Sequence, residues 1–401
     1  MDDASPTDLQ SPDFIDDPYS FYRKLRDIGR PHWAGHVDRT GTKGIWLITR
    51  YQDVARVLRD TQDVSKDVSR LIPAGQVTAF DRMLLNLDPP EHTQLRAVIA
   101  PLFSVTQVAR LEALIEGIVE SLLREMETRA ETDFVADFAV PLPIRVVADI
   151  IGVPREDMPL LKKWTDDLIT GLDSGRDNDS ERERVAASMR GMTRYLSDLV
   201  DSGIHPDGSL LDHVSEIRLK DGWPTTDDTL SLCLLMVLAG HETTVNLLGN
   251  GLLLLLQNPE QLEKLRNNPG LTRSAVDEML RCESPLQRGT YRITQVPYKV
   301  GGVTLEVGQQ ISAVIGSANR DEHQFPDPDV FDIQRSPNNH LAFGKGIHKC
   351  LGEKLARAEA RIAFTRLLER FPDIELLEPK PRWQEKTLFR GLKSLKVRMS
   401  A

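Results

Sequence analysis

Apolar residues recur at helical spacing along most of the chain. The clearest case is VTQVARLEALIEGIVESLLREME (105–127), whose apolar positions follow i, i+3, i+4 and i+7, as in an amphipathic helix. The segments that share this helical character are 92–103, 133–152, 158–173, 183–203 and 353–371. The sequence therefore predicts a protein built mainly of helices.

The longest periodic segment runs from Thr226 to Gln257. It opens with the start signal Pro-Thr-Thr-Asp-Asp (224–228), which supplies a capping hydroxyl and carboxylates that suit the positive end of a helix dipole. Its most apolar part, LSLCLLMVLAG (230–240), stops abruptly at His-Glu and is shorter than the roughly 20 residues needed to span a bilayer. We expect one long helix in the protein core.

Strand patterns are confined to two regions, GIWLIT (44–49) and YKVGGVTLEVGQQISAV (298–314). A helix-rich body with a small β lobe is therefore the expected fold. Because no Gly/Ser-rich linker interrupts the chain, we expect a single domain over residues 1–401, with a flexible N-terminus over residues 1–16.

Composition excludes several classes of protein. The net charge of −10 argues against nucleic acid as a general partner. The N-terminal residues MDDASPTDLQSPDF are polar and acidic, unlike a signal peptide or a membrane anchor. Only three cysteines are present, at 233, 282 and 350, so no disulfide framework is expected and a reducing cytoplasm is the favoured location.

The last of these cysteines stands in FGKGIHKCLG (343–352), among three glycines and a histidine. Cys350 could be a buried filler, half of a disulfide, a nucleophile, a zinc ligand or an iron ligand. Glycines allow tight turns and close approach of the backbone to another group. A long helix begins just after the cysteine, so its N–H groups would favour a thiolate. A zinc site would need further ligands, and the chain has no CxxC pair.

The pattern Phe-Gly-x-Gly-x-His-x-Cys-x-Gly resembles the cysteine-ligand loop of the cytochrome P450 family, and in particular its soluble bacterial members. The resemblance implies the P450 fold, in which a long distal helix lies over haem b and the cysteine loop lies beneath it. It also implies that Cys350 is the axial iron ligand, because a thiolate donates electron density that favours O–O cleavage. Other loop residues expected at the cofactor are Phe343, Gly344, His348 and Gly352.

A second motif, AGHETT (239–244), lies in the middle of the long predicted helix. His241 and Glu242 begin the zinc-protease pattern HExxH, but Val245 stands where the second histidine is needed. The motif also resembles the distal helix of cytochromes P450. That resemblance implies that Ala239 and Gly240 leave room for O2 above the haem, and that Thr243 and Glu242 deliver protons.

Two further motifs carry charged residues at helical spacing. Glu278 and Arg281 in EMLR are three residues apart, and the resemblance makes them a structural pair whose third member is either Arg335 or His340. In DPPEHTQLR, His92 and Arg96 are four residues apart and share one helical face. The resemblance implies that these two residues, together with Arg292 and His348, bind the haem propionates.

Basic residues around the cysteine loop suggest a surface for a redox partner. The chain shows no flavin or iron–sulfur domain of its own. We therefore expect an external ferredoxin or flavodoxin, supplied by an NAD(P)H reductase, to dock by charge attraction near Lys345, Lys349 and Lys354. The protein itself is expected to be a monomer.

The substrate is the least defined part of the hypothesis. By their position in the family, the expected lining segments are 68–85, 285–290 and 387–389, together with Met236 and Ala239. The individual residues expected there are Leu286, Arg288, Gly289 and Phe389. Because Arg288 and Arg390 are charged, a lipophilic substrate with a polar or acidic group is plausible, unless these arginines face solvent.

The sequence thus predicts a haem-thiolate monooxygenase that activates O2 with two electrons from a partner. It would hydroxylate or epoxidise a small lipophilic molecule such as a macrolide, steroid, terpenoid or other secondary metabolite. Two other classes remain as alternatives. One is a non-catalytic haem protein that acts as a sensor or carrier, and the other is a zinc hydrolase that uses His241 and Glu242.

Overall fold

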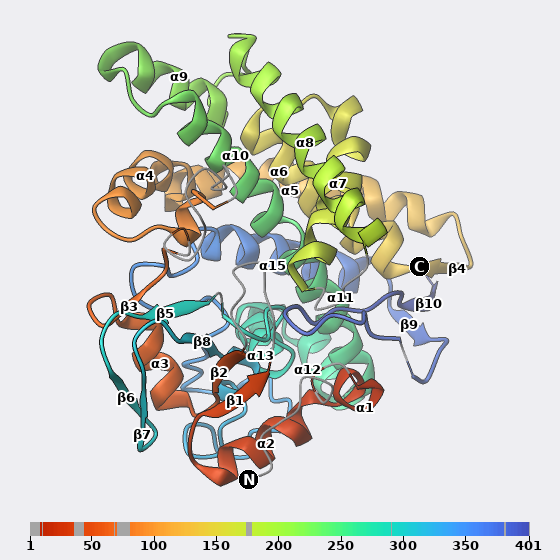
Figure 1. Cartoon of the computed structure of the whole chain (residues 1–401). Helices are drawn as coiled ribbons and strands as arrows, with labels where there is room; N and C mark the ends of the chain where they lie inside the picture. The colour runs from red at the N-terminus through yellow and green to blue at the C-terminus, as the bar shows by residue number, and fades with distance from the viewer. Residues whose placement is uncertain are drawn as a thin grey trace.

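The computed structural model of the chain describes residues 9, 11–35, 44–67, 69, 81–173, 179–289, 291–380 and 382–400. A large helical part occupies one side of the molecule, and a smaller part built around a five-stranded sheet occupies the other (Figure 1). This arrangement confirms the predicted helix-rich body with a small β lobe.

The helices account for most of the described chain. They are α1 (Pro12–Asp16), α2 (Pro18–Ile28), α3 (Tyr51–Arg59), α4 (Glu91–Ile99), α5 (Val105–Glu127), α6 (Pro141–Ile151), α7 (Met158–Asp173), α8 (Asp179–Asp201), α9 (Leu210–Asp221), α10 (Thr226–Gly240), α11 (Glu242–Gln257), α12 (Pro259–Asn267), α13 (Thr272–Cys282), α14 (Ile315–Ala318) and α15 (Glu353–Arg370). Helix α5 has the bounds that its apolar pattern predicts.

The predicted long helix is divided in two. Its start agrees with the sequence, because Thr225 and Asp228 form a capping box at the first turn of α10. The helix is interrupted at His241, whose backbone (φ −93°, ψ −70°) stays in the αR region but departs from ideal helical angles before α11 begins at Glu242. The motif AGHETT therefore lies on a junction between two helices, not within an uninterrupted one.

The strands form three sheets. They are β1 (His32–Gly35), β2 (Gly44–Ile48), β3 (Val64–Ser65), β4 (Glu131–Asp133), β5 (Arg292–Thr294), β6 (Tyr298–Val300), β7 (Val303–Leu305), β8 (Gln310–Ala313), β9 (Asp373–Leu376) and β10 (Lys396–Ser400). The main sheet has the order β1-β2-β8-β5-β3, with β2 and β8 parallel and the other pairs antiparallel. A second sheet has the order β4-β10-β9, and β6 and β7 form a hairpin.

The main hydrophobic core lies in the helical part and contains buried residues from Met83 through Met399. Helix α11 is buried along most of its length and packs against α13 and α15. Two smaller clusters fill the β lobe, one of them between the main sheet and the N-terminal helices α1 and α2. The chain from α10 to α11 thus runs through the centre of the molecule, as its apolar sequence predicts.

The N-terminal prediction needs one correction. Ser11 caps α1 through its side chain, and Phe14 of that helix is 5% exposed. Phe14 contacts Phe21 and Tyr22 edge to face, at centroid distances of 5.4 and 5.6 Å. The predicted flexible segment therefore does not extend to residue 16, because an aromatic side chain fixes α1 to α2.

Within the described residues, one stretch, Thr226–Gln257, is long and apolar enough to cross a membrane by length and composition. The segment from α4 to α5 would be a second candidate only if these two helices, which meet at a bend, were counted as a single span. In the folded protein 78% of the most apolar window of Thr226–Gln257 is buried. That burial agrees with the predicted core helix.

Candidate functional site

The loop that carries Cys350 is closed by its own backbone. The Cys350 N–H donates to the Phe343 carbonyl at 2.8 Å, and the Gly344 N–H donates to the Leu341 carbonyl at 2.8 Å. Gly346 has φ +78°, and a Cβ there would lie 2.7 Å from the carbonyl oxygen of Leu58 on α3. This glycine is thus required both by its left-handed backbone and by its contact with a neighbouring helix.

The Cys350 sulfur lies just before the N-terminus of α15. The Gly352 N–H bonds to the sulfur, which favours a thiolate, as the sequence predicts. Cys350 has accessible surface, yet it lies deep enough that desolvation outweighs this bond and raises its pKa to about 11. A bound metal cation would favour the thiolate further, because coordination deprotonates a thiol.

Four predicted residues from distant parts of the chain meet beside this loop. His92 and Arg96 lie on α4, Arg292 begins β5, and His348 belongs to the loop itself. The rings of His92 and His348 are 4.3 Å apart between centroids, and Arg96 donates to the Lys349 carbonyl at 2.8 Å. The structure thus places all four side chains in one region.

A fifth basic residue, Lys66, lies in the same region and was not predicted. It follows β3, is 3% exposed, and donates to the carbonyl of Tyr291 at 3.2 Å. Burial lowers the pKa of Lys66 well below its usual value, and the charge of Arg292 lowers it further. Nothing in the local sequence DVSKDVS marks this lysine, because its position depends on the pairing of β3 with β5.

The charges in this cluster favour an anionic ligand. Burial, followed by the positive charges of Lys66, His92, Arg292 and Arg96, lowers the pKa of His348 to about 2. Both ring nitrogens of His92 are buried and have no hydrogen-bond partner. Basic side chains gathered beside an unpartnered imidazole are groups that a pair of carboxylates would satisfy. The residues present therefore fit haem b, whose two propionates would lie here.

The second predicted group lies at the junction of α10 and α11. The Thr243 hydroxyl donates to the Ala239 carbonyl at 2.9 Å, and Ala239 is exposed. Glu242 is buried and forms an ion pair with Lys386 at 2.8 Å. The Cβ that Gly240 lacks would lie 2.8 Å from a methyl group of Val147 on α6. Helix packing accounts for Gly240, whereas Ala239, Glu242 and Thr243 remain available for chemistry.

The predicted structural pair is present and buried. Glu278 and Arg281 are 0% exposed and form two hydrogen bonds of 2.8 Å. Arg335 completes the group by donating to Glu278 at 3.0 Å, while His340 bonds to Asp277 instead. Arg335 is therefore the third member, a choice that the sequence left open.

The residues predicted to line the substrate pocket have different partners in the structure. Leu286 and Phe389 pair across an isolated bridge, Arg288 bonds to the carbonyl and hydroxyl of Thr387, and Met236 is buried on α10. Gly289 donates to the Ala313 carbonyl at 2.6 Å. Most of segment 68–85, and residue 290, lie outside the described residues.

Arg390 has a structural role and is not a free cation for a substrate. It forms an ion pair with Glu283 at 2.7 Å and donates to the carbonyls of Ile15 and Asp16 in α1. Its guanidinium lies 3.6 Å from the centroid of Trp383. Arg390 therefore fastens the C-terminal loop to the N-terminal helix.

The zinc-hydrolase alternative gains no support. Within the described parts of the chain, the only group of three side chains placed to share a metal ion is Asp321, Glu322 and His323. His241 and Glu242 do not belong to it. Burial lowers the pKa of His241, and neither of its ring nitrogens has a hydrogen-bond partner.

Comparisons with known proteins show the family of the chain. The family model for cytochrome P450 matches residues 200–395. Cytochrome P450 107B1 of Saccharopolyspora erythraea is 38% identical over 97% of this chain and 96% of its own, and cytochrome P450 monooxygenase PikC of Streptomyces venezuelae is 37% identical over 96% and 92%. The crystal structure of myxobacterial CYP267B1 in complex with myristic acid is 35% identical, with a TM-score of 0.91 over 98% of this chain and 99% of that one. The chain belongs to the cytochrome P450 family, whose members are haem b-binding oxidoreductases of the monooxygenase type.

Proposed function

We propose that this protein is a single-domain, monomeric and cytoplasmic haem-thiolate monooxygenase, and that it activates O2 with two electrons from a separate redox protein. It inserts one oxygen atom into a small lipophilic substrate by hydroxylation or epoxidation. The observation that carries the proposal is the meeting of His92, Arg96, Arg292 and His348 beside the loop of Cys350.

In this proposal the Cys350 thiolate would bind the haem iron, and the haem would supply the redox chemistry of O2. The Gly352 N–H bonds to the sulfur and tunes its donor strength. His92, Arg96, Arg292 and His348 bind the propionates and fix the orientation of the cofactor, and Lys66 is a further basic side chain in that group.

The residues at the junction of α10 and α11 supply protons. The Thr243 hydroxyl, now bonded to the Ala239 carbonyl, can turn toward O2 as a donor, and Glu242 holds or releases a proton at its carboxyl oxygen. The break at His241 suits this task, because a main-chain carbonyl released from the helix ladder accepts the threonine hydroxyl. A non-catalytic haem protein has no need of such an acid and alcohol pair.

The redox partner is expected to bind the face around Lys345, Lys349 and Lys354. Lys354 is exposed and Lys345 is half-buried. Lys349 forms an ion pair with Glu353 at 2.5 Å, so part of its charge is neutralised. Lys345→Glu with Lys354→Glu is expected to slow electron transfer from an acidic ferredoxin, with a weaker effect at high salt. Lys24→Glu on α2 is the control for a change of charge alone. Equal rates of electron transfer to the double variant and to Lys24→Glu would contradict the proposed docking surface.

A lipophilic molecule that can carry one polar or acidic group is the proposed substrate. Leu286, Phe389 and Met236 supply apolar surface, and Arg288 with Thr387 supplies a polar group beside them. The complex of CYP267B1 with myristic acid shows that a relative of similar fold binds such a molecule. Macrolides, steroids and terpenoids remain candidates, and ligand-induced shifts of the haem spin state across these libraries would identify the substrate.

Reduced protein under carbon monoxide tests the central claim. Thiolate-ligated haem gives a strongly red-shifted Soret band, and we expect this band from the protein. A band at the position of an ordinary haem–CO complex in folded protein, or purification without haem, would refute the assignment of Cys350. Sustained haem binding without O2 consumption would favour the sensor or carrier alternative.

A further inference from the structure

Residues 285–287 and 388–390 are far apart in the sequence, but they pair as a short antiparallel ladder. The Gln287 N–H donates to the Leu388 carbonyl at 2.8 Å, and a second main-chain bond of 2.9 Å closes the other end. Both segments belong to the expected wall of the substrate pocket. The two strands of this ladder therefore hold each other in place, and whatever fixes one of them fixes the wall.

The ladder has two faces, because successive side chains of an extended chain point to opposite sides. Leu286 and Phe389 stand directly opposite each other, and they share the face that meets the substrate under the proposed function. Gln287 and Arg390, the next residues along the two strands, therefore belong to the outer face. Both of them line a small cavity beneath α1, which Leu286 and Phe389 do not reach.

Helix α1 is bonded to the outer face through Arg390. The guanidinium donates to the carbonyl of Ile15 at 2.7 Å and to that of Asp16 at 3.1 Å. Its Nε donates to the carboxylate of Glu283 at 2.7 Å. One side chain of the ladder thus reaches two residues of α1 and the residue that follows α13.

Glu283 joins the second side chain of the outer face to the same network. It accepts from the Tyr19 hydroxyl of α2 at 2.9 Å, and that hydroxyl accepts from the Gln287 amide at 3.1 Å. Tyr19, Glu283, Gln287 and Arg390 are all buried. Buried hydrogen-bonded networks that include charges rigidify the elements that they join.

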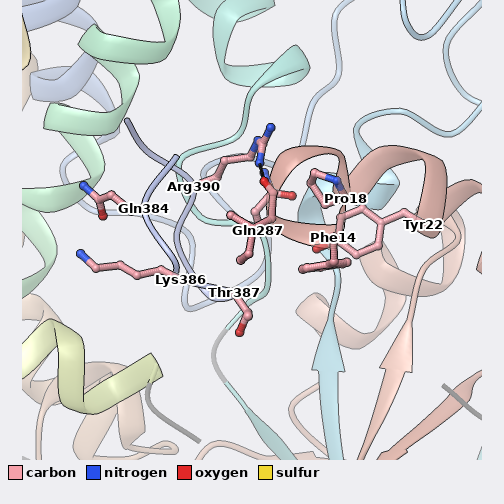
Figure 2. A pocket seen from close by; sticks show the side chains of 9 residues that line it. Phe14, Pro18, Tyr22, Gln287, Gln384, Lys386, Thr387 and Arg390 are labelled. Atoms are coloured by element: carbon pink, nitrogen blue, oxygen red, sulfur yellow. Dashed lines mark hydrogen bonds between the residues drawn. The ribbon is translucent and has the colours of Figure 1, made fainter. Parts of the chain in front are cut away.

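The space between α1 and the ladder is nearly filled. Figure 2 shows Gln287 and Arg390 beside Phe14 and Pro18 of the two N-terminal helices. In the cavity between them, the volume open to the centre of a water molecule is ≈ 10 Å³, which is room for about one water. Because packed interiors transmit displacement, a shift of α1 would move the ladder.

We propose that α1, acting through Arg390, determines the substrate selectivity of this protein by holding Leu286 and Phe389 at a fixed position in the pocket wall. The inference rests on the proposed monooxygenase function, which assigns these two residues to the substrate pocket. Arg390 is a positioning residue, because its guanidinium bonds to Glu283 and α1 on the face away from the substrate. The ligands affected are long apolar molecules, since a small ligand at the haem does not reach the wall.

The test measures how two ligands bind to the haem-loaded protein, each followed by the change that it causes in the absorption spectrum. Imidazole is too small to reach the wall, and 1-octylimidazole adds an apolar chain that does. The selectivity is the Kd of imidazole divided by the Kd of 1-octylimidazole. Hydrogen exchange of the main-chain N–H groups in the ladder supplies a second measurement, which needs no ligand.

Two variants loosen the contact of α1 at different points. Arg390→Lys keeps a positive charge, but one ammonium group does not span the separate acceptors on Ile15 and Asp16. Phe14→Ala removes the ring that packs α1 against α2, and it changes no residue of the ladder. The two variants thus disturb the same contact from its two sides.

Two further variants serve as comparisons. Phe14→Leu retains an apolar side chain between α1 and α2. Phe371→Ala is the control for lost stability, because Phe371 is 1% exposed and follows the end of α15 that is remote from Cys350.

Arg390→Lys and Phe14→Ala are each expected to lower the selectivity about tenfold, the effect of losing roughly one methylene contact in an apolar pocket. Hydrogen exchange in the ladder should become faster, and the Kd of imidazole should stay at its wild-type value. Phe14→Leu should restore the selectivity. Phe371→Ala should lower the melting temperature while selectivity and exchange in the ladder remain those of the wild type.

Wild-type selectivity in both Arg390→Lys and Phe14→Ala would overturn the proposal. An equal loss of selectivity in Phe371→Ala would also overturn it, because general destabilisation would then be the cause. Weaker binding of imidazole in parallel with 1-octylimidazole would place the defect at the cofactor, with the same consequence. Failure of the proposed function is a different result, since the wild-type protein itself would then lack the thiolate–CO band.

Discussion

The carboxylate of Glu278 and the guanidinium of Arg281 bind each other through two hydrogen bonds of 2.8 Å, and neither side chain is exposed to solvent. Arg281 also donates to the carbonyls of Asn319 and Pro328, so the pair joins α13 to the segment that precedes the cysteine loop. Each charge depends on the other, because the surrounding protein cannot solvate it.

Glu278→Ala is expected to lower the free energy of unfolding by about 3–5 kcal/mol, because it leaves Arg281 buried without its counter-charge. Urea unfolding followed by circular dichroism measures the change, and haem content reports whether the cysteine loop is still formed. Arg129→Ala is the control. It removes a pair with Asp137 in which the arginine side chain is 53% exposed, so its cost should be about 0–1 kcal/mol. Equal costs for the two variants would contradict the structural role of Glu278.

Mutations of Arg335 and His340 distinguish which of the two residues supports Glu278. Arg335 bonds to Glu278 at 3.0 Å and to the carbonyl of Pro326 at 2.7 Å. Arg335→Ala should therefore destabilise the protein by about 1.5–3 kcal/mol, the contribution of a charged hydrogen bond. Combined with Glu278→Ala, it should cost less than the sum of the single changes. His340→Ala should add to Glu278→Ala without such coupling, because His340 bonds to Asp277. The reverse pattern in this double-mutant cycle would make His340 the third member.

Local patterns in the sequence predicted those structural features that depend on residues close together along the chain, such as helix bounds. The apolar spacing of 105–127 gave α5 its correct bounds, and the cap at Thr225 marked the start of α10. The sequence did not distinguish Arg335 from His340, and it did not indicate Lys66 or Lys386. Lys386 is 144 residues from Glu242, and Lys66 reaches its site only because β3 pairs with β5. Such contacts follow from tertiary packing, which one sequence without its fold does not specify.

Gly346 and Gly352 in the cysteine loop are expected to respond differently to alanine. Gly346 has φ +78°, and its Cβ would lie 2.9 Å from the Cα of Arg59, so Gly346→Ala should cost about 1–3 kcal/mol for the backbone alone. Gly352 has φ −79°, and the nearest atom to its Cβ, on Phe103, is 3.9 Å away. Gly352→Ala should bind haem as the wild type does, while Gly346→Ala should purify with less haem. Normal haem content in both variants would show that the loop tolerates the displacement.

Lys66 is expected to slow the loss of haem. Lys66→Met keeps the length of the side chain and removes its charge from the cluster of His92, Arg292 and His348. A hydrogen bond to a charged group contributes about 1.5–3 kcal/mol, so haem transfer to excess apomyoglobin should become about tenfold faster or more. Lys349→Met is the control, because Lys349 is 49% exposed and pairs with Glu353. If Lys66→Met folds normally and loses haem at the wild-type rate, Lys66 does not contribute to haem binding.

Glu359 on α15 is expected to make stability depend on pH. It is 1% exposed, its Oε2 has no partner, and burial raises its pKa from 4.5 to about 8. Because the folded protein holds this proton more tightly than the unfolded chain, the contribution of Glu359 to stability is fully present below pH 4.5. It is lost as the pH rises toward about 8, by at most about 1.4 kcal/mol per pH unit. Glu359→Gln removes the titrating group. Its melting temperature relative to the wild type should therefore increase steadily between pH 5 and pH 8.

Glu369→Gln supplies the comparison for this titration, since Glu369 lies on the same helix with its side chain 51% exposed. Its melting temperature should follow that of the wild type at every pH, apart from a constant offset. A constant offset in Glu359→Gln as well would mean that Glu359 is already ionised in the folded protein at pH 5. A buried carboxylate in that state would require a cation or a water molecule at Oε2. Glu359 would then belong to a polar site in the buried face of α15.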